Sequence, residues 1–198
     1  MISETILLKY NAHLKIYEKG SYLFQENQHA SYYFQVSVGE VKMFNFNDDG
    51  KEFIQGIFTE NDSFGEPPLL NGKLYLTNAI ATTKSEVWTM SKDNFLMMLY
   101  ENPDVAIAVC TRLSNRLYYK SIMAMEISSE DAEHRLLRFF DYLKLHVANL
   151  TKNDKYPINL TRQQLADLTG LRVETVIRSV KSLEKKKAII IKERKIFR

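Results

Sequence analysis

The sequence is poor in the residues on which several common kinds of protein depend. A single cysteine, Cys110, among 198 residues cannot form a disulfide within the chain, and alone it cannot hold a zinc ion or an iron–sulfur cluster. No apolar run approaches the roughly 18 residues that span a bilayer, and the N-terminus lacks a signal-peptide pattern. We therefore expect a cytoplasmic protein that has no metal site and does not enter a membrane.

Catalytic patterns are also missing. We find no nucleophile–base pairing and no metal-ligand spacing, and seven glycines leave little material for a phosphate-binding loop. The sequence therefore argues against an enzyme. His13, His29, His134 and His146 have no spacing that favours haem ligation, so we interpret them as ordinary surface or core residues. Haem sensing stays open on these grounds alone.

Charge is distributed unevenly along the chain. Residues 1–150 contain 14 Lys and Arg against 19 Asp and Glu, whereas residues 151–198 contain 13 against 5. The net charge of +3 thus combines an acidic body of −5 with a basic C-terminal segment of +8. Such a segment indicates nucleic acid or another anionic surface as partner, and a solvated basic tail is the alternative.

Residues 13–100 are predicted to form many short strands. Runs rich in β-branched and aromatic residues, such as Tyr32–Val38 and Val41–Phe44, alternate with glycines, and Asn47–Gly50 is a strong turn sequence. Short strands at this spacing are typical of an antiparallel sandwich or barrel rather than of a parallel sheet.

A long helix is predicted from Pro103 to about Met125, because this stretch contains no further proline and no glycine. Its length of roughly 33 Å exceeds what a small barrel covers, so part of its apolar stripe is expected to face a second copy of the chain. An ordinary core helix is the alternative. We expect Cys110 to pack in a core, or to form an intersubunit disulfide if it lies on a two-fold axis. The residues assigned to the dimer interface are Val105, Val109, Leu113 and Leu117.

Residues 158–184, INLTRQQLADLTGLRVETVIRSVKSLE, carry the most specific pattern. Thr161 and Gln164 form a capping box that starts a helix over 162–168. A turn around Gly170 leads to a second helix over about 172–185. Apolar residues at helical spacing form a buried stripe on the second helix, and polar residues share the opposite face. The pattern predicts a helix-turn-helix whose second helix enters the major groove of DNA.

The side chains on the polar face suit base recognition. Arg178 can donate two hydrogen bonds to O6 and N7 of guanine, and Glu174 can accept one from N4 of cytosine. The backbone at the start of the first helix favours a phosphate. The segment after Lys185 resembles a β-hairpin wing with basic edges. For the helix-turn-helix pattern as a whole, an αα-hairpin with an ion-paired surface is the alternative. The residues expected at DNA are Thr161, Arg162, Gln163, Arg172, Val173, Glu174, Thr175, Arg178, Ser182 and Lys186.

Over nearly its whole length the chain resembles the Crp/Fnr family of bacterial transcription regulators. The resemblance rests on Tyr32–Met43, Phe64–Glu66, Pro103–Asp104 and, most specifically, Thr161–Arg178. It implies an α+β fold with an N-terminal double-stranded β-helix, a jelly-roll-like β-roll of the cyclic-nucleotide-binding type. A long dimerisation helix and a C-terminal winged helix-turn-helix follow. The implied domains are the sensor in 1–102, the helix in 103–127 and the DNA-binding domain in 128–198.

The same resemblance implies partners. Family members bind near-palindromic double-stranded DNA as homodimers, and RNA polymerase is a further expected partner. The family's recognition Glu and Arg fall on Glu174 and Arg178. The cAMP-responsive branch often has another arginine before the glutamate, where this chain has Val173. The departure predicts a different base at one position of the half-site.

The effector pocket that the family implies departs from its pattern. Cyclic-nucleotide-binding members hold the ribose and phosphate with a Phe-Gly-Glu turn and pair the phosphate with an arginine that precedes a serine or threonine. Phe64, Gly65, Glu66 and Thr77 match these positions, but the arginine position is Leu76. An apolar side chain cannot pair with a phosphate.

Two further departures have the same consequence. Pro67 and Pro68 remove two backbone donors after the turn. The positions that cap the adenine fall on Lys120 and Ser121, and a lysine replaces the usual small hydroxyl residue at the first. We predict that cAMP does not bind with useful affinity, while an unknown small-molecule effector stays open. A small-ligand sensor that acts through protein–protein contacts is the alternative function.

Overall fold

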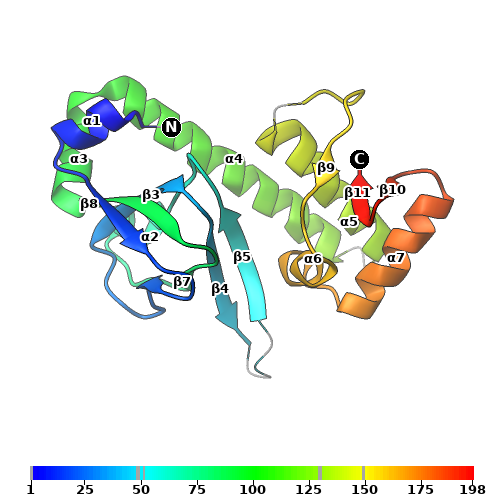
Figure 1. Cartoon of the computed structure of the whole chain (residues 1–198). Coiled ribbons are helices and arrows are strands. Elements are labelled where there is room, and N and C mark those ends of the chain that lie inside the picture. The colour runs from blue at the N-terminus through cyan, green and yellow to red at the C-terminus, as the bar shows by residue number, and fades with distance from the viewer. Residues whose placement is uncertain (1, 48–49, 51, 129–130, 149) are drawn as a thin grey trace. The chain divides into compact units, whose positions relative to one another are not determined.

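The computed structural model describes residues 2–47, 50, 52–128, 131–148 and 150–198. The chain forms two compact units, Met1–Thr111 and Arg112–Arg198. One long helix, α4 (Pro103–Ser128), contributes residues to both units (Figure 1). Each unit has its own core of buried side chains.

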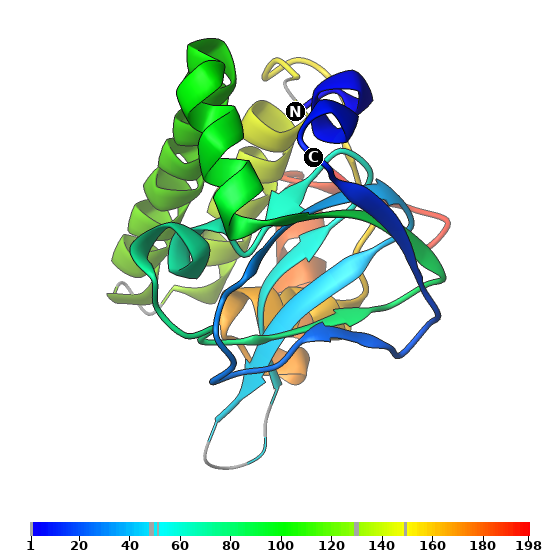
Figure 2. The same ribbon diagram turned by 90° about the vertical axis from the view of Figure 1, so that its left-hand side faces the viewer.

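Two four-stranded antiparallel sheets form the N-terminal unit, and their strands wrap around a common interior (Figure 2). The strand orders are β1-β8-β3-β6 and β2-β7-β4-β5. Strands distant in sequence are neighbours in both sheets, which gives the predicted jelly-roll-like arrangement. The first sheet consists of β1 (His13–Tyr17), β8 (Ser85–Ser91), β3 (Tyr32–Val38) and β6 (Ser63–Phe64). The second consists of β2 (Tyr22–Phe24), β7 (Asn78–Ala81), β4 (Val41–Phe46) and β5 (Glu52–Phe58).

Aromatic rings fill the interior between these strands, because alternate side chains of a strand point to the same face. The ring of Phe34 stacks on that of Phe64 with centroids 5.3 Å apart. Phe24 stacks on Tyr75 at 3.7 Å. The two ring pairs belong to one buried cluster, so the protein's own side chains occupy this part of the roll.

Three helices of this unit are not among the elements that the sequence predicts: α1 (Glu4–Lys9), α2 (Glu66–Asn71) and α3 (Lys92–Glu101). Ser91 caps α3 by accepting a hydrogen bond from the Asn94 N–H. Phe95, in α3, is buried and stacks on Tyr33 of β3 with centroids 4.5 Å apart. The region predicted to be rich in strands, 13–100, therefore extends too far, because its last residues form α3, a helix that packs on the sheet. In the predicted turn 47–50, Asp48 and Asp49 lie outside the described residues.

Helix α4 begins at Pro103, as predicted, and runs to Ser128. The stripe assigned to the dimer interface is divided, however. Val109 is buried within the chain, Val105 and Leu113 are half-buried, and Leu117 is 68% exposed. Val109 therefore packs inside its own chain and is not available to a partner.

The most exposed apolar side chains of α4 include Ile107 at 64% and Met125 at 71%. Cys110 is also exposed, which corrects the expectation that it packs in a core. The predicted stripe is divided because a series of residues four apart does not stay on one face of a helix. At about 3.6 residues per turn, each step of four overshoots a full turn by about 40°, so the predicted stripe drifts from the buried side at Val109 to the exposed side at Leu117.

The C-terminal unit packs helices and a small sheet around one buried cluster. Leu136, Leu165, Val180 and Ile196, from four different elements, are at most 1% exposed within it. The helices are α5 (Ala132–Tyr142), α6 (Arg162–Thr169) and α7 (Val173–Lys185), with a π-helical turn η1 (Leu143–Val147) after α5. The sheet has the order β10 (Ile190–Lys192), β11 (Lys195–Phe197), β9 (Pro157–Ile158). This is the predicted winged helix-turn-helix.

Arg198 fastens the sheet to the helices. Its Nε donates to Oδ1 of Asp141 at 2.6 Å and its Nη2 to Oδ2 at 3.1 Å, which makes a two-pronged ion pair. Its Nη1 donates to the backbone oxygen of Ala188 at 2.7 Å. A planar guanidinium suits this geometry, and the contact holds the end of β11 against α5.

Candidate nucleic-acid interface and effector site

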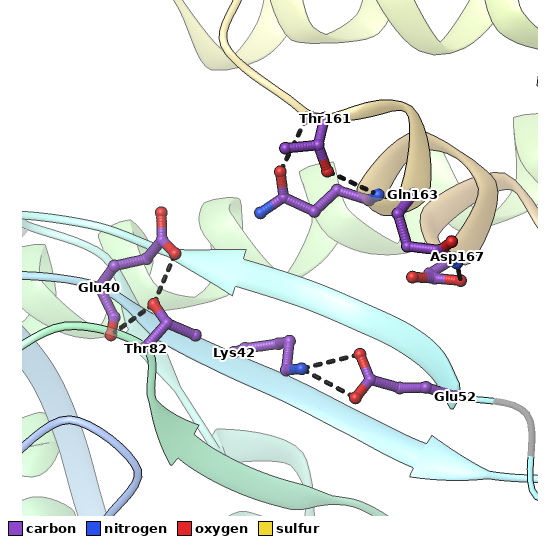
Figure 3. A network of polar contacts seen from close by, with 8 residues as sticks. Glu40, Lys42, Glu52, Thr82, Thr161, Gln163 and Asp167 are labelled. Carbon is purple, nitrogen blue, oxygen red and sulfur yellow. Dashed lines mark hydrogen bonds and ion pairs between the residues drawn. The ribbon is translucent and has the colours of Figure 1, made fainter. Parts of the chain in front are cut away.

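Helix α6 starts at a complete capping box, as predicted. The Thr161 hydroxyl accepts a hydrogen bond from the Gln164 N–H at 3.1 Å, and the Thr161 N–H donates to Oε1 of Gln164 at 2.8 Å. Figure 3 shows this cap and also Gln163, whose Nε2 donates to Oδ1 of Asp167 at 2.8 Å. Two of the residues expected at DNA, Thr161 and Gln163, therefore already bond within α6.

The turn between α6 and α7 is fixed from both sides. Gly170 adopts a φ of 71°, in the left-handed region that favours glycine, and ends α6. Arg135, buried in α5, donates from Nη1 to the backbone oxygen of Thr169 at 3.2 Å. A cation there complements the negative end of the α6 dipole. The angle at which α7 leaves the turn is thus held by the core as well as by the turn residues.

One face of α7 is buried and the other is open. Val176, Val180 and Leu183 are at most 1% exposed, as predicted. The open face has a hollow whose lining residues recur at spacings of three and four, and four of the six carry a charge. They are Glu174, Ile177, Arg178, Lys181, Ser182 and Lys185, and we name this surface the reading face.

The sequence pattern identifies half of the reading face. It includes Glu174, Arg178 and Ser182 but not Ile177, Lys181 and Lys185. Extending the i, i+3, i+4 spacing from Glu174 along the helix adds all three. Ile177 falls outside the prediction because isoleucine does not belong to the polar set on which the pattern was built.

The other predicted residues near α7 lie around the reading face rather than on it. Arg172 is exposed at the N-cap, and its side chain forms no capping hydrogen bond. Thr175 is half-buried. Val173 is half-buried and packs against the core cluster. In α6, Arg162 is half-buried, and burial lowers the pKa of its guanidinium.

Lys186 is engaged within the protein. Its Nζ lies 2.7 Å from Oε2 of Glu133 in α5. Hydrogen bonds from Lys186 and from Ser182 hold the pKa of the Glu133 carboxyl below its ordinary value. The pair raises the pKa of Lys186 in turn. A carboxylate therefore already neutralises the lysine that the sequence predicts to meet a phosphate.

The wing is a tight two-residue hairpin. Glu193 and Arg194, at its tip, have φ values of 51° and 65°, and Lys192 pairs with Lys195. Positive φ at both central residues is the geometry of a type I′ turn, which matches the twist of the strands. The hairpin therefore presents three basic side chains next to each other, as its sequence predicts.

In the N-terminal unit the Phe-Gly-Glu turn forms the start of α2. Gly65 has a φ of 80° and precedes Glu66, which is 1% exposed. Pro67 and Pro68 occupy the first turn of α2, where backbone N–H groups have no partner within a helix. Replacing two of these N–H groups by proline rings leaves fewer donors for an anion at this end of α2.

The segment after α2 does not aim a cation inward. Leu76 is 78% exposed, while Thr77 is buried next to it. Tyr75 is buried on the Phe24 ring, its hydroxyl donates to the Tyr32 oxygen at 3.4 Å, and burial raises its pKa to about 12.

The predicted adenine-capping residues, Lys120 and Ser121, belong to the C-terminal unit rather than to the unit that contains the turn. The Ser121 hydroxyl donates to the Leu117 backbone oxygen at 3.0 Å, one helical turn earlier. Burial lowers the pKa of Lys120, and the charge of Arg116 acts in the same direction. The part of these two residues in an effector site stays a prediction.

Metal clusters and membrane spans are both absent from the described ranges. Within 2–47, 50, 52–128, 131–148 and 150–198, no three His, Cys, Asp or Glu side chains are grouped so that they could hold a metal ion. No helix in the same ranges has the length and apolar content to cross a membrane.

A β-roll, a long helix and a winged helix with a cationic reading face define a class of protein: a DNA-binding regulator with a sensor-type domain. Family models agree with both parts. The cyclic nucleotide-binding domain matches residues 14–102, and the Crp-like helix-turn-helix domain matches residues 134–197. The chain belongs to the Crp/Fnr family of transcription regulators, which are not enzymes.

Individual relatives are distant. The cAMP-activated global transcriptional regulator CRP of Pasteurella multocida is 27% identical over 175 residues, which is 88% of this chain and 84% of the relative. The probable transcriptional regulator flp of Lacticaseibacillus casei is 25% identical over 177 residues, 89% of this chain and 78% of the relative.

Among solved structures, FixK2 from Bradyrhizobium japonicum matches with a TM-score of 0.74 and 20% identity, covering 93% of this chain and 91% of that one. The c-di-GMP-responsive regulator CLP of Xanthomonas campestris matches with a TM-score of 0.72 and 20% identity, covering 98% of each chain. At this identity the two likenesses establish the fold.

Proposed function

We propose that this regulator acts as a homodimer that binds a two-fold symmetric DNA site through α7, and that it does so without cAMP. The observation that carries the proposal is the reading face. Arg178, Lys181 and Lys185 follow Glu174 along one exposed side of a helix whose other side is buried. Cations at this spacing suit phosphates at the rim of a major groove, and Arg178 suits a guanine within it.

The exposed apolar residues of α4 support a dimer. Ile107, Leu117 and Met125 are 64% to 71% exposed on a 26-residue helix. Apolar side chains repeated along a helix are stable when a second helix covers them. We assign 103–127 to dimerisation, 1–102 to the sensor and 128–198 to DNA binding. Two copies of α7 then address two half-sites about one helical turn apart, and RNA polymerase is the further partner we propose.

The N-terminal unit supports independence from cAMP. The position for a phosphate-pairing arginine is Leu76, which is exposed, and Pro67 and Pro68 replace two donors at the start of α2. The aromatic cluster with Tyr75 stacked on Phe24 fills the neighbouring interior. A relative, the CRP of Pasteurella multocida, is described as cAMP-activated. We propose that this chain either has a different small-molecule effector or needs none.

The experiment is selection of binding sites from randomised DNA with purified protein and no added effector. We expect a two-fold symmetric site whose affinity falls steeply between low and physiological salt. Arg178→Ala should relax the preference for one guanine in each half-site at a cost of about 1–3 kcal/mol. Recovery of no site, with or without a pool of metabolites, would favour the sensor that acts through protein contacts.

A calorimetric titration tests the second part. We expect no heat of binding when cAMP is added at concentrations up to the micromolar range, and no change in DNA affinity. Micromolar binding would contradict the proposal. Selection that succeeds only after a different metabolite is added would identify a working pocket with another ligand.

A further inference from the structure

An exposed isoleucine lies in the middle of the reading face. Ile177 is 40% exposed and lines the hollow together with Glu174, Arg178 and Lys181. The buried side of α7 is formed by other residues, with Val176 and Val180 at most 1% exposed. Ile177 is therefore not a core residue whose edge happens to reach solvent.

The surroundings of Ile177 limit what can cover it. Lys181 lies one turn after it on the helix and Glu174 one turn before it, so charged side chains border it along the axis. An apolar protein surface over this hollow would bury those charges without partners. The major groove of DNA instead offers phosphates to the cations and base edges to the centre.

Only one of the four bases presents a methyl group in the major groove. Thymine carries a methyl group at C5, whereas the other three bases carry no methyl group there and are distinguished by their hydrogen-bonding groups. An isoleucine against the amino group of cytosine would leave a buried donor unpaired. We infer that Ile177 selects thymine in each half-site by packing on its C5 methyl group, at a base pair next to the guanine assigned to Arg178. This inference rests on the proposed function, since it requires α7 to enter the major groove.

The test separates the methyl group from every other feature of the base pair. In the selected site, each thymine is replaced in turn by uracil, which removes the methyl group and keeps the hydrogen-bonding edge. We expect one thymine per half-site at which this change weakens binding about four-fold, the factor that corresponds to one buried methyl-sized group. Conversely, 5-methylcytosine should bind better than cytosine at that position.

The link to Ile177 comes from comparing variants on the same set of sites. Ile177→Ala should bind the thymine site less tightly and should not distinguish thymine from uracil, while Ile177→Val should keep the distinction. Val147→Ala is the matched control, because Val147 is an exposed β-branched residue of the same unit outside the reading face. Thermal unfolding monitored by circular dichroism checks that each variant is folded.

The outcomes are distinct. If wild-type protein selects a symmetric site but no thymine in it is sensitive to uracil, the inference is wrong and the proposed function stands. The inference is equally wrong if Ile177→Ala keeps the full penalty for uracil. If no site is selected at all, the proposed function fails and the inference fails with it.

Discussion

Lys186 and Lys187 are consecutive lysines with different surroundings. The Nζ of Lys186 is 2.7 Å from a carboxylate oxygen of Glu133. Lys187 is exposed and forms no ion pair with any residue that the structure describes. A run of three lysines in the sequence gives no way to tell these environments apart, because the partner carboxylate is 53 residues away.

We expect Lys187→Ala to weaken binding to all DNA sequences about equally and to reduce the salt slope by about one. Lys186→Ala should have the smaller effect, since Glu133 already neutralises this charge. Fluorescence anisotropy titrations at several salt concentrations measure both. A loss for Lys186→Ala as large as that for Lys187→Ala would show that a phosphate displaces Glu133 in the complex.

Tyr75 leads to a prediction about pH. Its folded-state pKa is about 12, against 10.0 for an exposed tyrosine, because burial disfavours the phenolate. The unfolded chain therefore loses this proton first, and the free energy of unfolding should fall as pH rises from 10 to 12. In Tyr75→Phe the fall should be smaller, since the group is absent from both states. Urea unfolding at about pH 9, 10, 11 and 12 measures how the free energy of unfolding changes with pH. Equal slopes for both proteins would contradict the prediction.

Among the individual elements, α6 has a capping box that four residues of sequence predict and that is present in full. Such local patterns are reliable because the bonds they describe connect residues three apart in the chain. The same sequence also predicts Thr161 at DNA, but its hydroxyl is used by the cap. A cap residue can stabilise the first helix of the helix-turn-helix without touching DNA.

Thr161→Ala should lower the free energy of unfolding by about 1 kcal/mol, the usual cost of losing an N-cap hydroxyl. Thr161→Ser, which keeps the hydroxyl, serves as the control and should lose much less. Chemical unfolding measures stability, and binding-site selection measures base preference. An altered base preference in Thr161→Ala with unchanged stability would support the predicted contact of this residue with DNA.

Helices α2 and α3 show where the prediction of elements from sequence fails. Two consecutive prolines, Pro67 and Pro68, give no sign of a helix, but both rings lie in the first turn of α2, where a missing N–H costs no intrahelical hydrogen bond. In α3, Phe95 and Met98 have helical spacing and Ser91 is a cap, so a signal exists. This signal is easily missed because α3 is only ten residues long and directly follows β8, so its residues can be taken for part of the sheet region.

At the scale of the whole molecule, the proposed dimer depends on α4. Leu117 is the one residue of the predicted interface that is exposed, and it lies about a quarter turn around the helix from Ile107. We expect Leu117→Asp to shift the protein from dimer to monomer, because a carboxylate would be buried between two helices. Val109→Ala should instead leave the dimer intact and reduce stability by creating a cavity inside one chain.

Sedimentation equilibrium at several protein concentrations distinguishes these outcomes. The monomeric variant should also bind one half-site weakly and lose cooperative binding to the symmetric site. Dimers of unchanged affinity in Leu117→Asp would mean that a different surface makes the contact. If Val109→Ala were monomeric, Val109 would belong to the dimer interface, as the sequence predicts.

The order and kind of the elements from α6 to the wing follow from the amino-acid sequence alone. Capping, a turn glycine and helical periodicity act between residues only a few positions apart, so they are sufficient to predict α6, α7 and the wing. The unequal charge of the two parts of the chain is likewise a property of the sequence, which no fold can change.

Which of these side chains are available to a partner depends instead on tertiary packing. Packing pairs Lys186 with Glu133, buries Val109, exposes Leu76 and leaves Ile177 open between charged neighbours. Each of these outcomes depends on contacts between residues that are distant along the chain, or on which helix face the core covers. The periodicity of apolar residues shows that a helix has two different faces, but tertiary packing decides which side chains the core covers and which stay exposed to solvent.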